Sequence, residues 1–259
     1  MSALAPVFEQ CRSENRAALV TYLPCGYPSK QGGIDTVVAM VESGADIVEL
    51  GVAYSDPVMD GPVIQRAADD ALRGGIRVHD VFTYAEAVAA AGGAPVVMTY
   101  WNPVLKYGVE AFARDLAAAG GRGLITPNLI PEEAGEWIEA ADRHGLDKIF
   151  LAAPSSTPER LDLTTKASSG FLYAASTMGV TGARDTVDNV APELVARIRA
   201  VSDIPVGVGL GVRSRAQAAE IAGYADAVIV GSALVSAAGE SLAAVRSLTS
   251  ELAAGVRGV

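Results

Sequence analysis

Short apolar runs and amphipathic segments alternate along the chain. Eight runs rich in aliphatic and β-branched residues predict strands, because uninterrupted apolar runs are typical of parallel strands covered on both faces. These runs are residues 18–23, 46–50, 95–99, 123–125, 148–152, 170–174, 205–207 and 225–230. The amphipathic segments between them predict helices, for example over residues 32–43, 109–119, 131–144 and 191–201.

This even alternation indicates the fold class. Eight βα units in 259 residues are the (β/α)₈ pattern, an α/β TIM barrel, and a doubly wound open sheet is the less even alternative. The chain has no long linker rich in Ser, Gly or Pro, so we expect one domain over residues 1–259. An extra helix over residues 3–14 is expected to cap the lower mouth of the barrel, and one long helix over residues 233–254 to close the ring.

Composition narrows the class of partner and the compartment. The formal net charge is −10, which argues against nucleic-acid and membrane partners and favours backbone N–H groups for holding an anionic substrate. Cys11 and Cys25 form no C-x-x-C pair and are too few for a disulfide scaffold. The first residues lack a signal-peptide pattern, and no apolar run approaches the roughly 20 residues of a membrane helix. We therefore expect reduced thiols and a cytoplasmic protein.

One carboxyl group falls at the end of the second predicted strand. Side chains alternate along a strand, so Glu49 shares a face with Ile47. The opposite face carries Val48 and Leu50, which should pack on helices, so Glu49 should point into the barrel near its upper end, where such barrels carry their sites. Partial desolvation should raise its pKa, which suits a group that gives and takes a proton. The alternative is a structural Glu paired with an Arg or with backbone N–H groups.

The loop after this strand carries two more carboxylates, Asp56 and Asp60, and ends in Gly61-Pro62, a signal for the start of a helix. Asp60 could reach over the barrel mouth. The alternative is that Asp60 caps the helix that starts near Pro62.

Glycines follow the last two predicted strands, at residues 207–211 and at Gly231-Ser232. Glycines let backbone N–H groups approach an anion, and the loops after strands 7 and 8 are the usual phosphate site of these barrels. Tight turns are the alternative. The glycine-flanked loop at residues 176–184 is either a lid that excludes water or a long connector.

Other kinds of chemistry lack suitable residues. A Schiff-base aldolase needs a Lys near a strand end, and none of the four lysines is well placed. His79 and His144 lie at helix ends on the lower side, so no metal-ligand pattern exists. The glycine string lies too late in the chain for a dinucleotide fingerprint. Carboxylate acid–base chemistry on a phosphorylated substrate remains.

Residues 48–62 read Val-Glu-Leu-Gly-Val-Ala-Tyr-Ser-Asp-Pro-Val-Met-Asp-Gly-Pro and closely resemble the signature of tryptophan synthase alpha subunits. The resemblance extends over essentially the whole chain and includes residues 21–28, 98–103, 179–182, 207–211 and 231–233. It implies a TIM-barrel lyase of tryptophan biosynthesis that cleaves indole-3-glycerol phosphate to indole and glyceraldehyde 3-phosphate. In this resemblance Glu49 looks like the general acid/base, and Asp60 like the carboxylate that accepts the indole N–H and stabilises positive charge.

The resemblance also implies a substrate site. Six positions match the walls of the indole slot: Tyr22, Ile64, Met98, Tyr100, Ile125 and Tyr173. Of these, Tyr173 is also a candidate hydrogen-bond partner of Glu49. Six more match the phosphate cradle: Gly182, Gly209, Leu210, Gly211, Gly231 and Ser232. Thr181 matches a lid residue that closes on Asp60.

The resemblance further implies a partner and no cofactor in this chain. Pyridoxal phosphate is expected only in the beta subunit, which receives indole in an alpha2beta2 tetramer. Four residues fall in the loops that dock this subunit in relatives: Ala53, Asp56, Pro57 and Asn102. Three positions depart from the family pattern, and one of them is Trp101, which is bulkier than in some relatives. Met59 stands where a small residue is usual, and Asn128 stands where an Asp is expected, so the same charged contact cannot form.

Three other functions fit parts of this pattern. Another phosphate-binding barrel enzyme, such as an isomerase or the synthase that forms indole-3-glycerol phosphate, would need a differently placed set of Lys, Glu or His. A stand-alone lyase on the same scaffold differs from a subunit mainly in its response to the beta chain. A degenerate barrel that only activates the beta chain would not need to retain Glu49 and Asp60.

Overall fold

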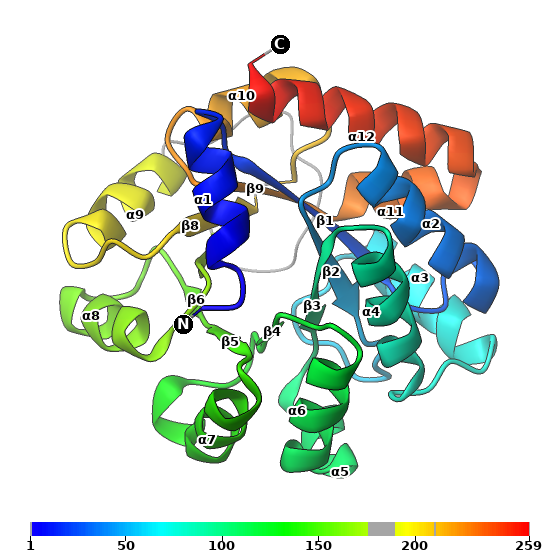
Figure 1. Ribbon diagram of the computed structural model, residues 1–259, viewed down its shortest axis with the longest axis horizontal. Helices are drawn as coiled ribbons and strands as arrows, with labels where there is room; N and C mark the ends of the chain where they lie inside the picture. The colour runs from blue at the N-terminus through cyan, green and yellow to red at the C-terminus, as the bar shows by residue number, and fades with distance from the viewer. Residues whose placement is uncertain (1, 176–189, 210, 259) are drawn as a thin grey trace.

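A computed structural model describes residues 2–175, 190–209 and 211–258 of the chain. In these residues one parallel sheet runs in the order β5-β4-β3-β2-β1-β9-β8-β7-β6 (Figure 1). Its strands are β1 Ala18–Pro24, β2 Ile47–Gly51, β3 Ala94–Met98, β4 Gly123–Ile125, β5 Asp147–Ile149, β6 Leu151–Ala152, β7 Leu172–Ala175, β8 Val206–Gly209 and β9 Ala227–Val230. The end strands β5 and β6 are separated only by Phe150, so the chain itself joins the two edges of the sheet. The predicted TIM barrel is confirmed.

Each predicted strand has a counterpart, and one of them is divided. The predicted strand over residues 148–152 appears as β5 and β6, because β5 pairs with β4 whereas β6 pairs with β7. At the interruption the carbonyl group of Phe150 accepts the N–H of Tyr173, at 3.0 Å. The division therefore marks the place where the chain stops pairing with β4 and begins to pair with β7.

Helices follow the strands and form the outer ring, with α1 ahead of β1. Their bounds are α1 Ala5–Ser13, α2 Lys30–Glu42, α3 Pro62–Arg73, α4 Asp80–Ala90, α5 Trp101–Tyr107, α6 Val109–Ala118, the 3₁₀ turn η1 Pro131–Glu133, α7 Gly135–His144, α8 Pro158–Ala167, α9 Val190–Arg199, α10 Arg215–Ala222, α11 Ser232–Glu240 and α12 Leu242–Arg257.

Two helix predictions are corrected. The single long helix expected over residues 233–254 is two helices, because Ser241 has an extended backbone and its hydroxyl group accepts the N–H of Ala244 as the N-cap of α12. The helix expected over residues 131–144 begins as the 3₁₀ turn η1, and α7 starts only after Ala134.

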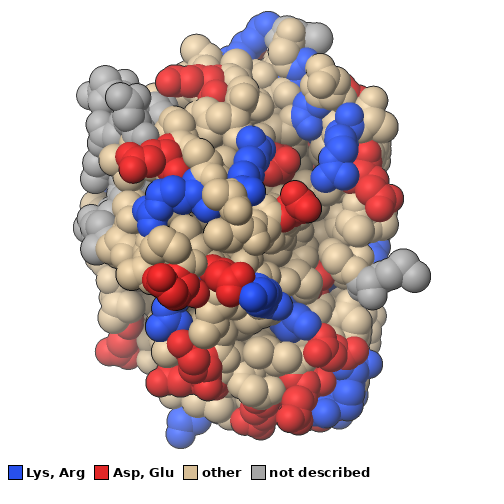
Figure 2. Space-filling view, turned by 90° about the vertical axis from the view of Figure 1, so that its left-hand side faces the viewer, with Lys and Arg blue, Asp and Glu red and all other residues tan. Residues whose placement is uncertain are grey.

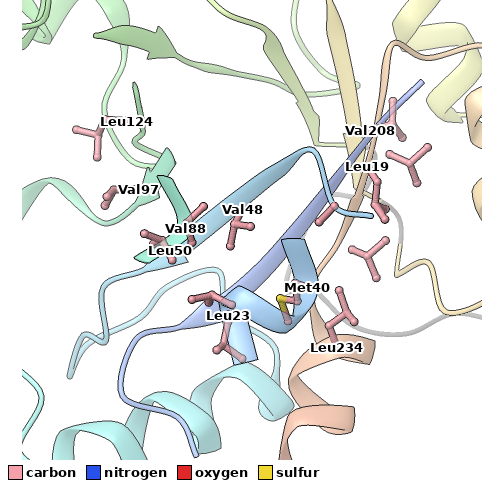
Figure 3. Close-up of a cluster of buried hydrophobic side chains, with 14 of the residues drawn as sticks. Leu19, Leu23, Met40, Val48, Leu50, Val88, Val97, Leu124, Val208 and Leu234 are labelled. Atoms are coloured by element: carbon pink, nitrogen blue, oxygen red, sulfur yellow. The ribbon is translucent and has the colours of Figure 1, made fainter. Parts of the chain in front are cut away.

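The main hydrophobic core lies between the sheet and the helices. Figure 3 shows strand residues such as Val48 and Leu50 among side chains from the helices, including Met40 of α2 and Val88 of α4. Both strand residues are fully buried in this layer. The alternation predicted for β2 is therefore confirmed, and its other face must look into the barrel.

A second cluster fills the barrel and includes Ile47. Helix α1 closes the lower mouth with Leu4 and Phe8, and the ring of Phe8 lies 6.0 Å from that of Phe171 (Figure 1). The buried carboxylate of Asp147 accepts the N–H of Leu4, the N-cap residue of α1, at 2.8 Å. The predicted capping helix is confirmed, and the opposite end of the barrel is left for chemistry.

The surface carries charges of both signs. Figure 2 shows acidic and basic side chains interspersed over one face rather than gathered by sign. Within the described residues, no helix is both long enough and apolar enough to cross a membrane.

Candidate active site

The upper end of the barrel brings Tyr22 and Glu49 side by side. Parallel pairing of β1 with β2 places the two residues in register, so both side chains point into the barrel. On the next two strands, Met98 of β3 pairs with Ile125 of β4. Both belong to the cluster that fills the barrel or pack against it. These strand ends form one wall of a common site.

Glu49 is a buried carboxyl group whose hydrogen-bonding capacity is not fully satisfied. Its side chain is 1% exposed, and its Oε1 atom has no hydrogen-bond partner in the structure. Burial raises the pKa of Glu49 from 4.5 to about 8. The predicted burial and raised pKa are therefore confirmed, and neither Arg nor backbone N–H pairs with that oxygen. At neutral pH this carboxyl group holds a proton that it can donate.

Tyr22 and Tyr173 flank this carboxyl group. Burial raises the pKa of both hydroxyl groups well above the ordinary value, and the charge of Glu49 raises it further. No hydrogen bond joins Tyr173 to Glu49 among the described contacts. The hydroxyl group of Tyr173 instead lies over Gly209, where a Cβ atom would stand 2.7 Å from it. Gly51 similarly leaves room for the hydroxyl end of Tyr22.

Asp60 lies in the loop between β2 and α3. Its Oδ1 atom accepts a hydrogen bond from the hydroxyl group of Tyr100 at 3.0 Å, and its backbone carbonyl accepts one from Gln65 Nε2 at 2.8 Å. The N-cap position of α3 belongs to Gly61, so Asp60 is not the capping residue. Burial raises the pKa of Asp60, and the bond from Tyr100 opposes this shift. The two carboxyl groups thus have different surroundings, one apolar and one hydrogen-bonded.

The charges of Asp60 and Glu49 both affect the hydroxyl group of Tyr22. Burial raises the pKa of Tyr22 most, followed by the charges of Asp60, Cys25 and Glu49. Tyr22 therefore lies within electrostatic reach of both carboxyl groups, which places them around the same space. Among the described residues, no group of three or more His, Cys, Asp or Glu side chains is arranged to hold a metal ion.

The glycine turns predicted to hold phosphate lie beside this space. Gly209 ends β8 and pairs in register with Ile229 of β9, so the turns after the two strands leave the same edge of the barrel. Gly211 has a φ of 66°, which favours glycine. Gly231 precedes Ser232, the first residue of α11. The first N–H groups of a helix lack helical partners and favour an anion.

The glycine turns and the indole-slot residues meet at Gly231. A Cβ atom on Gly231 would stand 3.7 Å from the ring of Tyr22 and 3.9 Å from Ile64 Cδ1. Three other predicted site residues, Thr181, Gly182 and Leu210, lie outside the described residues.

The four predicted partner-facing residues share the upper rim. Ala53, Asp56 and Pro57 lie in the loop between β2 and α3, and Asn102 lies in α5, which follows β3. Asn102 donates a hydrogen bond through Nδ2 to the hydroxyl group of Tyr54, at 3.2 Å. The loop after β2 and the start of α5 therefore touch one another beside Asp60.

An open cavity of about 950 Å³ lies at the same rim. Met59 borders it from the loop that carries Asp60, and Leu151, Ala153 and Ser155 border it from the fifth strand position. Sequence reasoning singled out no site residue at that strand position. The Pro154-Ser155 break directly after the strand was the available signal.

Sequence reasoning also missed two anchoring contacts. Gln65 holds the backbone of Asp60 from the first turn of α3. Asn128 accepts the backbone N–H of Trp101 through Oδ1 at 2.9 Å, so the residue that replaces the expected Asp still supplies an oxygen at the start of α5. Neither contact has a motif, because each joins segments that are distant in the sequence or depends on loop geometry.

Comparison with known proteins identifies relatives along the whole chain. The family described as tryptophan synthase alpha chain matches residues 8–258. The tryptophan synthase alpha chain of Nocardia farcinica is 72% identical over 256 residues, which are 99% of this chain and 96% of the relative. That of Mycolicibacterium paratuberculosis is 69% identical over 257 residues, with 99% and 95% covered.

Solved structures give the same answer for the fold. A tryptophan synthase structure from Mycobacterium tuberculosis superposes with a TM-score of 0.96 at 67% identity and covers 99% of this chain and 98% of the other. Tryptophan synthase subunit alpha from Legionella pneumophila superposes with a TM-score of 0.88 at 31% identity, with full coverage of both chains. The barrel is thus similar to relatives that are close and distant in sequence.

Proposed function

Since the chain belongs to the tryptophan synthase alpha chain family, we propose how its own residues perform the reaction of that family. The chain is a carbon–carbon lyase of tryptophan biosynthesis that cleaves indole-3-glycerol phosphate to indole and glyceraldehyde 3-phosphate. The observation that carries the mechanism is the buried carboxyl group of Glu49, with a pKa of about 8.

Glu49 serves as both acid and base. Its neutral carboxyl group donates a proton to C3 of the indole ring, which weakens the bond between C3 and the glyceryl carbon. The carboxylate that results takes the proton of the adjacent glyceryl hydroxyl group, and a carbonyl group forms as the carbon–carbon bond breaks. The electron pair of that bond returns to the ring. Glu49 ends the cycle protonated, as it began, and a pKa near neutrality suits both transfers.

Asp60 stabilises the charge that the first proton transfer creates. Protonation at C3 leaves positive charge on the ring nitrogen, and a carboxylate that accepts the N–H favours that state. The hydrogen bond from Tyr100 opposes the effect of burial and so favours the ionised form of Asp60. Division of labour between a neutral and an ionised carboxyl group follows from their surroundings.

The phosphate group is held by main-chain N–H groups. Gly209, Gly211, Gly231 and Ser232 supply the turns after β8 and β9 and the start of α11, where an anion is favoured. Gly182 and Leu210 belong to the same phosphate cradle on the basis of the family resemblance alone, and Thr181 is proposed on that basis as a lid residue that closes on Asp60. The indole ring then lies against Tyr22 and Ile64, which adjoin Gly231.

The reaction proposed here needs only proton transfer and charge stabilisation, so we assign no cofactor to this chain. Pyridoxal phosphate belongs to the beta subunit in this proposal, and the assembly is an alpha2beta2 tetramer. The beta subunit docks on the rim formed by Ala53, Asp56, Pro57 and Asn102. Exposed apolar side chains in the segments after β2, β3 and β4 support a docking surface there: Val58, Leu105 and Ile130. The free, buried thiols of Cys11 and Cys25 support a cytoplasmic location.

Release of indole from indole-3-glycerol phosphate by the full-length chain tests the mechanism. Asp60→Asn should slow turnover about 100-fold, the scale of one positioned acid–base or charge-stabilising group. Asp69→Asn, which changes an exposed acid in α3, is the matched control and should leave the rate unchanged. An Asp60→Asn variant with the parental rate would return Asp60 to a structural role.

Addition of purified beta chain separates a subunit from a stand-alone lyase. A subunit should gain rate severalfold on assembly, whereas a stand-alone enzyme should not respond. Absence of indole release by the intact chain, with and without the beta chain, would favour the degenerate barrel.

A further inference from the structure

The hydroxyl group of Tyr100 makes three hydrogen bonds at the upper rim. It accepts the backbone N–H of Val58 at 3.2 Å and that of Met59 at 3.0 Å. It also lies 3.0 Å from Asp60 Oδ1 and donates to it. Three consecutive residues of the loop after β2 are thus held by one side-chain oxygen from the segment that follows the neighbouring strand β3.

We propose that Tyr100 is a positioning residue, whose hydroxyl group fixes both the loop that carries Asp60 and the orientation of the Asp60 carboxylate. This role goes beyond that of a wall of the indole slot, and it rests on the proposed function of Asp60.

The direction of the hydrogen bonds is the core of the argument. A phenolic hydroxyl group has one proton and can accept hydrogen bonds through its oxygen. Because two backbone N–H groups donate to that oxygen, its single proton is left for Asp60. Asp60 must then present a lone pair, which the ionised carboxylate always does. The backbone of the loop therefore aims the Tyr100 proton at Asp60, and this bond favours the ionised carboxylate.

Tyr100 is itself firmly placed. Its side chain is 5% exposed, and the residues on either side are tied to β4 and to the segment after it. The N–H of Thr99 bonds to the carbonyl of Ile125 at 3.1 Å, and the N–H of Trp101 bonds to Asn128 Oδ1 at 2.9 Å. Because Tyr100 is anchored in this way, its hydroxyl group ties the partly exposed loop after β2 to the barrel.

Among the residues that the structure describes, two further tyrosines interact with Asp60 or Tyr100. Tyr22 of β1 responds to the charge of Asp60, of Glu49 and of Tyr100. Tyr54 lies in the same loop as Asp60, and its ring packs against that of Tyr100 in a tilted arrangement with centroids 5.4 Å apart. Its hydroxyl group accepts a hydrogen bond from Asn102. Tyr54 therefore offers a matched control, since it carries a hydroxyl group in the same aromatic pair that does not contact Asp60.

The experiment compares Tyr100→Phe with Tyr54→Phe in the full-length chain, assayed by indole release across pH. Tyr100→Phe should lower kcat about 10-fold, the scale of a lost hydrogen bond to a charged group, with KM changed far less. Because the lost bond opposes protonation of Asp60, the acidic limb of the pH profile should move to higher pH. Tyr54→Phe should leave kcat and the acidic limb at their parental values.

Two results would overturn the proposal. One is a Tyr100→Phe variant with parental kcat and an unmoved acidic limb. The other is a rise in KM without either change, which would make Tyr100 only a wall of the slot. If Asp60→Asn is slow while Tyr100→Phe is normal, the proposed function stands and the positioning role falls. If Asp60→Asn is itself normal, the function proposed for Asp60 fails first.

Amide hydrogen exchange on the unmodified chain gives a second test that needs no variant. The N–H groups of Val58 and Met59 should exchange at least 10-fold more slowly than those of the neighbouring exposed residues Ser55 and Asp56, because each is bonded to Tyr100. Equal exchange rates at the four positions would contradict the proposed hold of Tyr100 on this loop, even if the Tyr100→Phe variant failed to fold.

Discussion

Two carboxyl groups lie at opposite ends of the same barrel, and both are 1% exposed: Glu49 in β2 and Asp147 in β5. Asp147, at the lower end, accepts hydrogen bonds from the hydroxyl group of Ser2 at 2.9 Å and from the N–H of Leu4 at 2.8 Å. Glu49, at the upper end, has an oxygen with no partner. The two carboxyl groups are thus equally buried, but Asp147 is hydrogen-bonded whereas an oxygen of Glu49 is not.

This difference teaches how to separate a structural acid from a chemical one. Asp147 places a negative charge at the N-terminus of α1 and ties that helix over the lower mouth, so its contacts stabilise the fold. Glu49 contributes no comparable contact, and its buried carboxyl group stays neutral until about pH 8. Mutation should therefore affect activity at one end and stability at the other.

The largest expected effect is on activity at the upper end. Glu49→Gln should lower indole release at least about 1000-fold, because the amide keeps the shape of the side chain but can neither donate nor take the proton. Circular dichroism should show the parental fold. Residual turnover within about 10-fold of the parent would remove Glu49 from the proton-transfer role.

The next effect is on the pH dependence of stability. The folded-state pKa of Glu49, about 8, lies above its ordinary value of 4.5. A raised carboxyl pKa means that stability is greatest where the group is protonated in both states, and it falls as pH rises toward the folded-state pKa.

Between pH 5 and pH 8 the intact chain should therefore lose about 3 kcal/mol from the free energy of unfolding through this one group. Urea unfolding at several pH values measures the loss. Glu49→Gln lacks the titrating group and should show a flatter dependence over that interval. Parallel curves for the two proteins would argue against a neutral Glu49 in the folded state.

A smaller effect is expected at the lower end. Asp147→Ala removes the charged acceptor of the Leu4 N–H and leaves it only the longer bond to Ser2 Oγ at 3.3 Å, so the change should lower the free energy of unfolding by about 2 kcal/mol. Turnover at a temperature where the variant is folded should stay near the parental value. Asp147→Asn keeps an acceptor oxygen and should recover much of the stability. A large fall in kcat for the folded Asp147→Ala variant would break the division between the two ends.

The smallest effect is expected from Ser2→Ala. This change removes the hydroxyl group that donates to Asp147 and accepts the Leu4 N–H at 3.3 Å, but it leaves the shorter bond from Leu4 to Asp147. It should therefore cost about 1 kcal/mol or less in unfolding free energy. Thermal unfolding of Ser2→Ala and Asp147→Ala side by side measures the ranking. A Ser2→Ala variant as unstable as Asp147→Ala would show that the hydroxyl group, rather than the N–H of Leu4, supplies most of the stabilisation.

Periodicity was enough to predict the strands, the barrel and the inward direction of Glu49, because burial on both faces leaves a strong apolar pattern. It did not predict the break at Phe150, which depends on how two neighbouring strands diverge in space. The division of the last helix at Ser241 did have a local signal, since Ser is a favoured N-cap residue.

The site was predictable where a strand or a glycine turn defines a residue, and less so where tertiary contacts do. The burial of Glu49 follows from β2, whereas the hydrogen bond between Tyr100 and Asp60 joins residues 40 positions apart. The structural role of Asp147 was only weakly indicated by the sequence. Gly123, its partner in the neighbouring strand, and Gly170 both leave room for its side chain, which no sequence spacing reveals.

Direct titration of the Glu49 carboxyl group tests the central claim most closely. Carbon-13 NMR of the chain labelled at the glutamate side-chain carboxyl carbons, recorded from pH 4 to pH 9 and compared with Glu49→Gln, identifies its resonance. A midpoint near pH 8 for the resonance that the variant lacks is the expected result. A midpoint near 4.5 would mean that Glu49 is ionised at neutral pH, with no proton to give to the indole ring.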